Sequence, residues 1–146
     1  MPFQFAHDAV LQYRKSLEQR EYRALERVHY EITRTEGEIS RVEDWLVSAR
    51  NSRAAELSRG VASIQVQDAY DRELALERHR NSLQNQLRDL KLKLQQHLKT
   101  YQVARQKREV LEALRNRQLD LYTREQTKRQ QNALDDLFLA RRRRSQ

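Results

Sequence analysis

The chain has 146 residues, of which only two are Gly and one is Pro, so it lacks the residues that build the many turns of a sheet protein. Charged residues make up 34% of the chain and apolar residues 38%. This apolar fraction is too low for a compact domain but sufficient for the narrow buried seam of a coiled coil. The net charge is +8 and Cys is absent, which excludes disulfides, zinc–thiolate sites and a thiol nucleophile.

The first predicted element is a helix over about 6–58. Apolar residues recur there at alternating spacings of three and four, as in a coiled coil. The series consists of Leu25, Val28, Ile32, Thr35, Ile39, Val42, Leu46 and Ala49, in which only Thr35 is polar. The earlier residues Val10, Tyr13 and Leu17 are out of phase with it, so we expect a stutter near residues 24–25.

A turn is predicted over about 59–63. Gly60 can adopt the left-handed conformation that ends a helix, and Ser63 can cap the next one. Gly37, in contrast, lies inside the first heptad series and is expected to be tolerated within the helix.

The second predicted helix covers about 64–140 and carries its own heptad series. That series runs through Leu83, Leu87, Leu90, Leu94, His97, Tyr101, Ala104, Arg108 and Leu111, with His97 and Arg108 as the polar exceptions. A turn near residue 61 makes the helices antiparallel, so that residue i faces roughly residue 122 − i and Ile39 lies near Leu83. The predicted fold class is therefore all-α, with residues 1–146 forming a single antiparallel coiled-coil hairpin.

The C-terminal end is the most basic part of the chain and has no predicted partner on the first helix after about residue 120. Residues 101–146 hold twelve basic and six acidic groups, and a basic tail over 141–146 begins with Arg141, Arg142, Arg143 and Arg144. Leu134, Leu137 and Phe138 precede this run on one helical face, which predicts a partner interface. The alternative is that Phe3 and Phe5 of the chain's own N-terminus pack there. The arginines can serve as a solvated tail, bind nucleic acid or meet anionic lipid.

Other patterns argue against catalysis. The four His residues lack the spacing of a metal site, two glycines cannot build a phosphate loop, and two paired helices offer no cleft, so we expect neither an enzyme nor a cofactor. Neither a secretory signal nor a transmembrane segment is predicted, which favours the cytoplasm. Near the hairpin tip, Trp45, Tyr70 and Leu74 either pack over the helix pair or anchor a partner.

Three short blocks stand out along the chain. The first is Phe3-Gln4-Phe5 followed by the segment 9–14, Ala-Val-Leu-Gln-Tyr-Arg. The second is the segment 107–114, Lys-Arg-Glu-Val-Leu-Glu-Ala-Leu. The third is Leu134-Asp135-Asp136. In content, order and spacing these blocks resemble the flagellar export protein FliJ family, which more commonly has Glu where Asp136 stands, and the resemblance spans essentially the whole chain.

The resemblance implies a component of the type III flagellar export apparatus, a coiled coil similar to the stalk of rotary ATPases, recruited to the cytoplasmic face of the inner membrane at the flagellar base. It implies three partners: the hexameric export ATPase, the cytoplasmic domain of the export gate, and export chaperones. We assign ATPase binding to the terminal end, namely Phe3, Phe5, Leu134, Leu137, Phe138 and Arg141–Arg144, and gate binding to Trp45, Tyr70 and Leu74. The alternative function is a generic structural or nucleic-acid-associated coiled coil.

Overall fold

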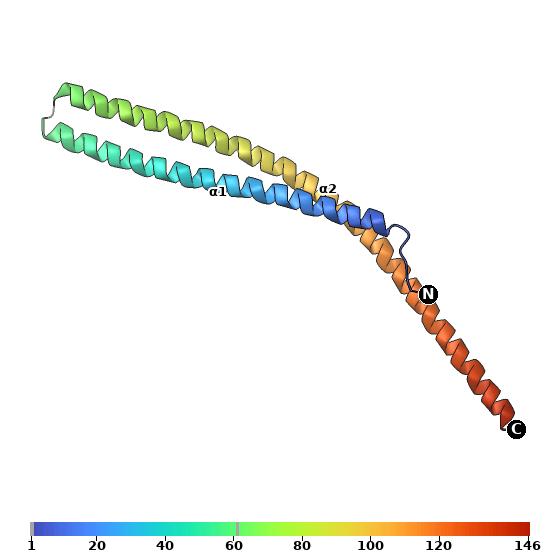
Figure 1. The fold of residues 1–146 in the computed structure, drawn as a ribbon. Coiled ribbons are helices and arrows are strands. Elements are labelled where there is room, and N and C mark those ends of the chain that lie inside the picture. The colour runs from blue at the N-terminus through green and yellow to red at the C-terminus, as the bar shows by residue number, and fades with distance from the viewer. Residues whose placement is uncertain (1, 61) are drawn as a thin grey trace. The chain divides into compact units, whose positions relative to one another are not determined.

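A computed structural model describes residues 2–60 and 62–146 and contains two long helices (Figure 1). Helix α1 spans Asp8–Ser58 and helix α2 spans Ser63–Arg144, and the described residues form no strand. The predicted all-α helical hairpin is therefore confirmed. Helix α1 begins two residues later than predicted, because the carbonyl oxygen of His7 accepts the first helical hydrogen bond, from the Leu11 N–H.

The chain divides into two compact units. The middle unit is Glu21–Tyr101, and the terminal unit combines Met1–Arg20 with Gln102–Gln146. Both helices contribute residues to both units, so the prediction of a single domain over 1–146 stays a prediction.

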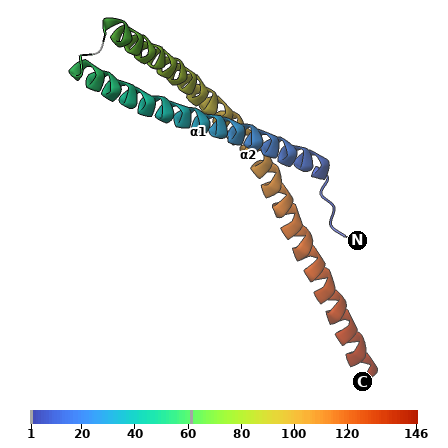
Figure 2. The same ribbon diagram turned by 60° about the vertical axis from the view of Figure 1, so that its left-hand side comes forward.

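In the middle unit the two helices lie side by side and run in opposite directions (Figure 2). The α1 seam, meaning the line of side chains buried against α2, follows the predicted heptads. Its buried residues are Leu25, Val28, Ile32, Thr35, Ile39, Val42 and Leu46. Thr35 fits this apolar line because its hydroxyl donates a hydrogen bond to the Glu31 carbonyl oxygen at 2.8 Å within the same helix.

Helix α2 supplies the other half of the seam. Leu83 is buried, whereas Leu87, Leu90 and Leu94 are half-buried. Leu83 joins Ile39, Val42 and Leu46 in one buried cluster, against which Leu76 and Leu87 pack. Leu83 shares this cluster with Ile39, but the predicted register of 122 − i is wrong by about four residues, because Arg53 of α1 pairs with Glu73 of α2, which gives roughly 126 − i.

At the tip of the middle unit, Gly60 has a φ of 71°, which confirms that it ends α1 in the left-handed conformation. The Ser63 cap is wrong: Ser63 is the first helical residue, and the carbonyl oxygen of Ala62 accepts hydrogen bonds from the N–H groups of Gln65 and Val66. Part of the predicted turn, Val61, lies outside the described residues.

The stutter predicted near residues 24–25 of α1 is wrong. Leu11 is only 1% exposed, whereas Val10 and Tyr13 face solvent. Counting back from Leu25 in steps of four and three gives residues 21, 18, 14 and 11, all of which are buried or half-buried, so the seam continues in phase. The sequence pattern misled because three of these four positions hold charged residues, Glu21, Glu18 and Arg14.

The predicted end of the second helix is also wrong, because α2 continues from residue 140 through the arginine run to Arg144. Ala and Arg are good helix formers, and no Gly or Pro follows Ala140. Four cations in the last turn also interact favourably with the negative end of the helix dipole.

The two glycines give opposite predictions for stability. Gly37 lies within α1 with nothing within 4 Å of an added Cβ, so Gly37→Ala should raise the free energy of unfolding by roughly 0.5–1 kcal/mol through helix propensity. Gly60→Ala should lower it by about 1 kcal/mol, because Ala is strained at a φ of 71°. Urea unfolding followed by circular dichroism measures both. Equal shifts in the same direction for the two variants would contradict this assignment.

Candidate protein-interaction surfaces

The distal segment, residues 127–146, is exposed along its whole length. It lies in the terminal unit, where the orange-to-red part of α2 extends past the N-terminal segment (Figure 1). Within it Leu134, Leu137 and Phe138, here called the distal stripe, are 60–68% exposed. Apolar side chains grouped at one helical face without cover are typical of a partner interface.

The distal stripe does not continue the seam. Tyr122 lies where the N-terminal segment still covers the seam side of α2, because the centroid of its ring is 5.6 Å from that of the Phe3 ring. At 3.6 residues per turn, the centre of the distal stripe is rotated roughly 110° around α2 from Tyr122. Arg141 extends the stripe at i+7 from Leu134. The stripe therefore faces away from the side on which the N-terminal segment lies.

The N-terminal segment packs against α2 near residues 115 and 122, which come before the distal stripe along the chain. Besides its contact with Tyr122, the Phe3 ring lies under the Arg115 guanidinium at 5.9 Å. Phe5 is 8% exposed, with its ring 5.8 Å from that of His7. The alternative in which Phe3 and Phe5 cover the distal stripe is therefore wrong. Their assignment to ATPase binding stays a prediction, and Phe5 can contact a partner only if this segment opens.

A charged layer replaces apolar packing in the seam of the terminal unit. Arg108, one of the two polar exceptions in the α2 heptads, donates from Nη2 to Glu18 Oε1 at 3.0 Å and also bonds Glu18 Oε2 and Glu112 Oε2. The side chains of Arg108 and Glu18 are 21% and 16% exposed. The hydrogen bond from Arg108 lowers the pKa of the Glu18 carboxyl, with a smaller opposing contribution from burial. The same bond, together with a second that Arg108 donates to Glu112, raises the pKa of Arg108.

A second charged layer lies in the middle unit near the turn. Glu73 is 5% exposed and lies 3.0 Å from Arg50 Nε and 2.7 Å from Arg53 Nη1. Arg50 Nη2 also donates to Glu77 Oε1 at 3.0 Å. These bonds to Glu77 and Glu73 raise the pKa of Arg50. A carboxylate buried in a seam is costly unless it is paired, and here two arginines from the facing helix pair it.

The three residues assigned to gate binding do not form one face. Trp45 is 56% exposed and precedes seam residue Leu46, whereas Tyr70 lies seven residues before Glu77, on the flank where Arg50 and Glu77 meet. Residues that precede and residues that follow paired seam positions lie on opposite flanks of an antiparallel coiled coil. Tyr70 is also engaged, because the Arg53 guanidinium lies 5.8 Å from its ring centroid. Leu74 is half-buried, immediately after Glu73.

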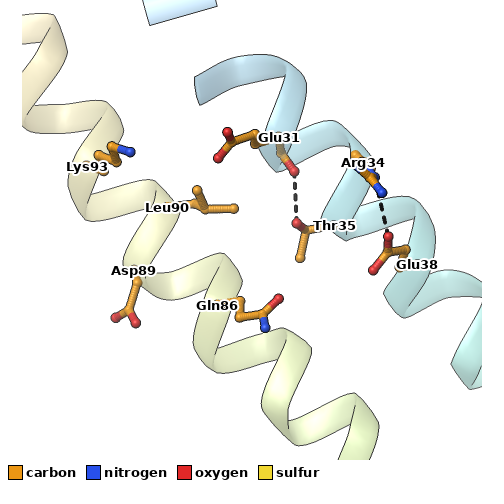
Figure 3. A pocket seen from close by; sticks show the side chains of 8 residues that line it. All are labelled: Glu31, Arg34, Thr35, Glu38, Gln86, Asp89, Leu90 and Lys93. Carbon is orange, nitrogen blue, oxygen red and sulfur yellow. Dashed lines mark hydrogen bonds and ion pairs between the residues drawn. The ribbon is translucent and has the colours of Figure 1, made fainter. Parts of the chain in front are cut away.

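A surface hollow follows one flank of the middle-unit seam (Figure 3). Leu90 points into the space between the helices opposite Thr35, and Arg34 lies 3.5 Å from Glu38 along α1. Charges of both signs line the hollow, from Glu31, Arg34, Glu38, Asp89 and Lys93. It offers no dry, convergent set of groups for catalysis.

Residues 2–60 and 62–146, which the structure describes, show neither a metal-binding group nor a membrane-spanning helix. They contain no group of three or more His, Asp or Glu side chains that could hold a metal ion. No helix among them is long and apolar enough to cross a membrane.

The structure also exposes an apolar surface that the sequence interpretation missed. Val10, Tyr13, Val110 and Leu121 of the terminal unit are 43–69% exposed. The available signal was the mismatch between Val10, Tyr13 and Leu17 and the later heptads, which we attributed to a stutter. An apolar series out of phase with a continuous seam indicates a second apolar face.

A model of the family described as Flagellar FliJ protein matches residues 5–146, which is nearly the whole chain. The searches of curated proteins and of solved structures found no match.

Substitution of Glu18 should destabilise the terminal unit at neutral pH and do so less in acid. Glu18→Gln leaves Arg108 half-buried with one charged partner fewer, which should cost roughly 1–2 kcal/mol at pH 7. Because the folded-state pKa of Glu18 is below its ordinary value of 4.5, its contribution is present above pH 4.5 and is lost as the pH falls through the folded pKa. Unfolding at pH 7 and pH 3, followed by circular dichroism, checks this.

The matched control is Glu125→Gln, which removes an exposed i,i+4 pair with Arg129 and should change stability little at either pH. A loss for Glu18→Gln that is as large at pH 3 as at pH 7 would contradict the ion-pair explanation.

Proposed function

Because the chain belongs to the FliJ family and is thus a component of the flagellar export apparatus, we propose that it binds the hexameric export ATPase through the distal segment of α2. The observation that carries this proposal is the uncovered distal stripe, Leu134, Leu137 and Phe138, followed within the same helix by four arginines. A single helix with an apolar face and a basic end has the form of a ligand for a central opening lined by apolar and acidic groups.

The apolar and basic parts have different roles in this proposal. Burial of the distal stripe supplies most of the affinity, since three exposed large side chains leave water on binding. The run Arg141–Arg144 speeds and orients the encounter with an acidic surface and contributes less to the final affinity. Phe3 and Phe5 contribute indirectly, because the N-terminal segment packs beside α2 near Tyr122, before the distal stripe along the chain.

The turn end of the middle unit supplies the second contact in this proposal. Trp45 is a large aromatic residue left 56% exposed beside a seam that is already filled by Leu46, so it suits an anchor for the export gate. Tyr70 and Leu74 face another flank and would contact the gate only if it wraps around the tip. Export chaperones are further partners that family membership suggests, and these contacts would hold the protein at the cytoplasmic face of the inner membrane.

Loss of the distal stripe should weaken ATPase stimulation. For Leu137→Ala with Phe138→Ala, the concentration giving half-maximal stimulation of the purified export ATPase should rise at least tenfold at both low and high salt, because two apolar anchors are removed. The matched control, Leu92→Ala with Leu98→Ala, truncates two exposed residues of α2 in the middle unit and should behave as wild type.

Replacing Arg141–Arg144 by Gln should slow association mainly at low salt. Deleting residues 134–146 tests the lipid alternative: stimulation that survives the deletion, together with lost binding to anionic liposomes, would make this segment a membrane anchor and overturn the proposal. Binding to nucleic acid that falls log-linearly with salt, without any ATPase effect, would favour the generic coiled-coil alternative.

A pull-down with the cytoplasmic domain of the gate tests the tip. Trp45→Ala should recover clearly less gate domain than wild type, whereas Val47→Ala, which truncates an equally exposed residue two positions away, should recover as much. Unchanged helicity by circular dichroism shows that the helix pair is intact. Equal recovery by Trp45→Ala and wild type would remove Trp45 from the gate interface.

A further inference from the structure

The exposed apolar surface of the terminal unit lies along one flank of its seam. In α1 it comprises Val10 and Tyr13, with half-buried Leu17 one turn further; the spacing i, i+3, i+7 places them on one helical face. In α2 it comprises Val110, half-buried Leu114 and Leu121, spaced i, i+4, i+11, which again is one face. We call these six residues the flank patch.

The ion pair between Glu18 and Arg108 shows that the two faces share a flank. These two residues occupy equivalent seam positions on the two helices. Leu17 directly precedes Glu18, and Leu114 directly precedes Arg115, which lies one heptad after Arg108. In an antiparallel coiled coil, residues that precede equivalent seam positions lie on the same side of the helix pair. Val10 and Leu121 lie one heptad before Leu17 and one heptad after Leu114, so the flank patch is continuous across both helices.

The rim of the flank patch is basic. The positions one turn beyond Leu17, Leu114 and Leu121 are Arg20, Arg117 and Arg124, and Lys107 lies one heptad before Leu114. Between residues 103 and 128 the corresponding positions of α2 hold no carboxylate. The opposite flank has a different character, since it carries Glu112, Arg105 and Lys15. An apolar centre with a one-signed rim is a specific surface rather than scattered apolar exposure.

We propose that the flank patch receives an acidic amphipathic helix from a partner protein, which lies along the patch as a third helix. The patch is long and narrow: residues 110–121 of α2 span roughly 16 Å at 1.5 Å per residue, the length of three helical turns. An amphipathic helix with anchors at i, i+3 and i+7 fits such a surface, and carboxylates beside its apolar face meet the basic rim. A second copy of this chain is disfavoured, because two basic rims would repel each other.

This surface is distinct from the distal stripe of the proposed ATPase contact. Leu121 and Leu114 lie roughly 90° from Tyr122 around α2 in one sense, and the distal stripe lies roughly 110° from it in the other. A single helical ligand cannot cover both. The flank patch therefore serves a partner that binds beside the ATPase-binding segment.

A defined probe tests the proposal. The probe is a fluorescein-labelled synthetic peptide of 21 residues, helical, with leucine along one face and glutamate on the other faces. The full-length protein should bind it with a Kd in the micromolar range at low salt, measured by fluorescence anisotropy. Tyr13→Ser combined with Val110→Ser should weaken binding at least tenfold, while Tyr30→Ser, at an exposed position of the middle unit, should not change it.

Two further measurements separate the electrostatic contribution to binding from the apolar one. A peptide with lysine in place of glutamate should not bind. The double variant Arg117→Gln with Arg124→Gln should bind the acidic peptide several-fold more weakly than wild type. Equal binding of the acidic and basic peptides, or unchanged binding by the Tyr13/Val110 variant, overturns the proposal. The proposal would also be overturned if the Leu137→Ala/Phe138→Ala variant no longer bound the peptide while the Tyr13/Val110 variant bound it normally. That result would place the acidic helix on the distal stripe.

Discussion

The pairing of Arg108 with Glu18 decides how the terminal part of α1 lies on α2. Leucine-rich heptads alone do not specify one alignment, since a slip by seven residues again sets apolar positions against apolar positions. Paired charges in the seam do specify one alignment of the two helices. A slip of seven residues replaces Arg53, the seam partner of Glu73, by Gly60 in one direction and by Leu46 in the other, so the buried carboxylate loses this partner in both cases. The two charged layers therefore fix the register on which the positions of the surface residues depend.

The fold was largely predictable from the sequence because a two-helix seam depends on local periodicity. The apolar heptads and the turn at Gly60 follow from residue spacing, whereas the predicted register lies about four residues from the one that the Arg53–Glu73 pair sets. The mistaken stutter arose because counting only apolar residues hides the charged seam positions Arg14, Glu18 and Glu21, whose suitability depends on the residues that the facing helix places opposite them. A partner such as Arg108 is about ninety positions away along the chain, and its pairing becomes visible only in three dimensions.

The candidate surfaces were less predictable than the fold, because a surface depends on which flank a residue faces. Trp45 and Tyr70 seemed to share the tip by their closeness along the hairpin, yet they flank the seam on opposite sides. Val10 and Tyr13 were apolar residues assigned to the seam, and they lie outside it. The stripe of Leu134, Leu137 and Phe138 was predictable, since an amphipathic helix without a partner needs no knowledge of register.

The distal segment has an energetic character unlike the rest of α2. Helices without tertiary packing are marginal in water, and residues 127–146 bury nothing against the rest of the chain. Local terms support this stretch: the Glu125–Arg129 pair at its start and the favourable position of Arg141–Arg144 at the helix end, each of them worth only a fraction of a kcal/mol. Two threonines, Thr123 and Thr127, bond back to carbonyl oxygens four residues earlier and add little helix stability. A partner that covers the distal stripe would supply the missing tertiary packing. Binding there would therefore stabilise the helical form of this segment, whose stability belongs as much to the complex as to the chain itself.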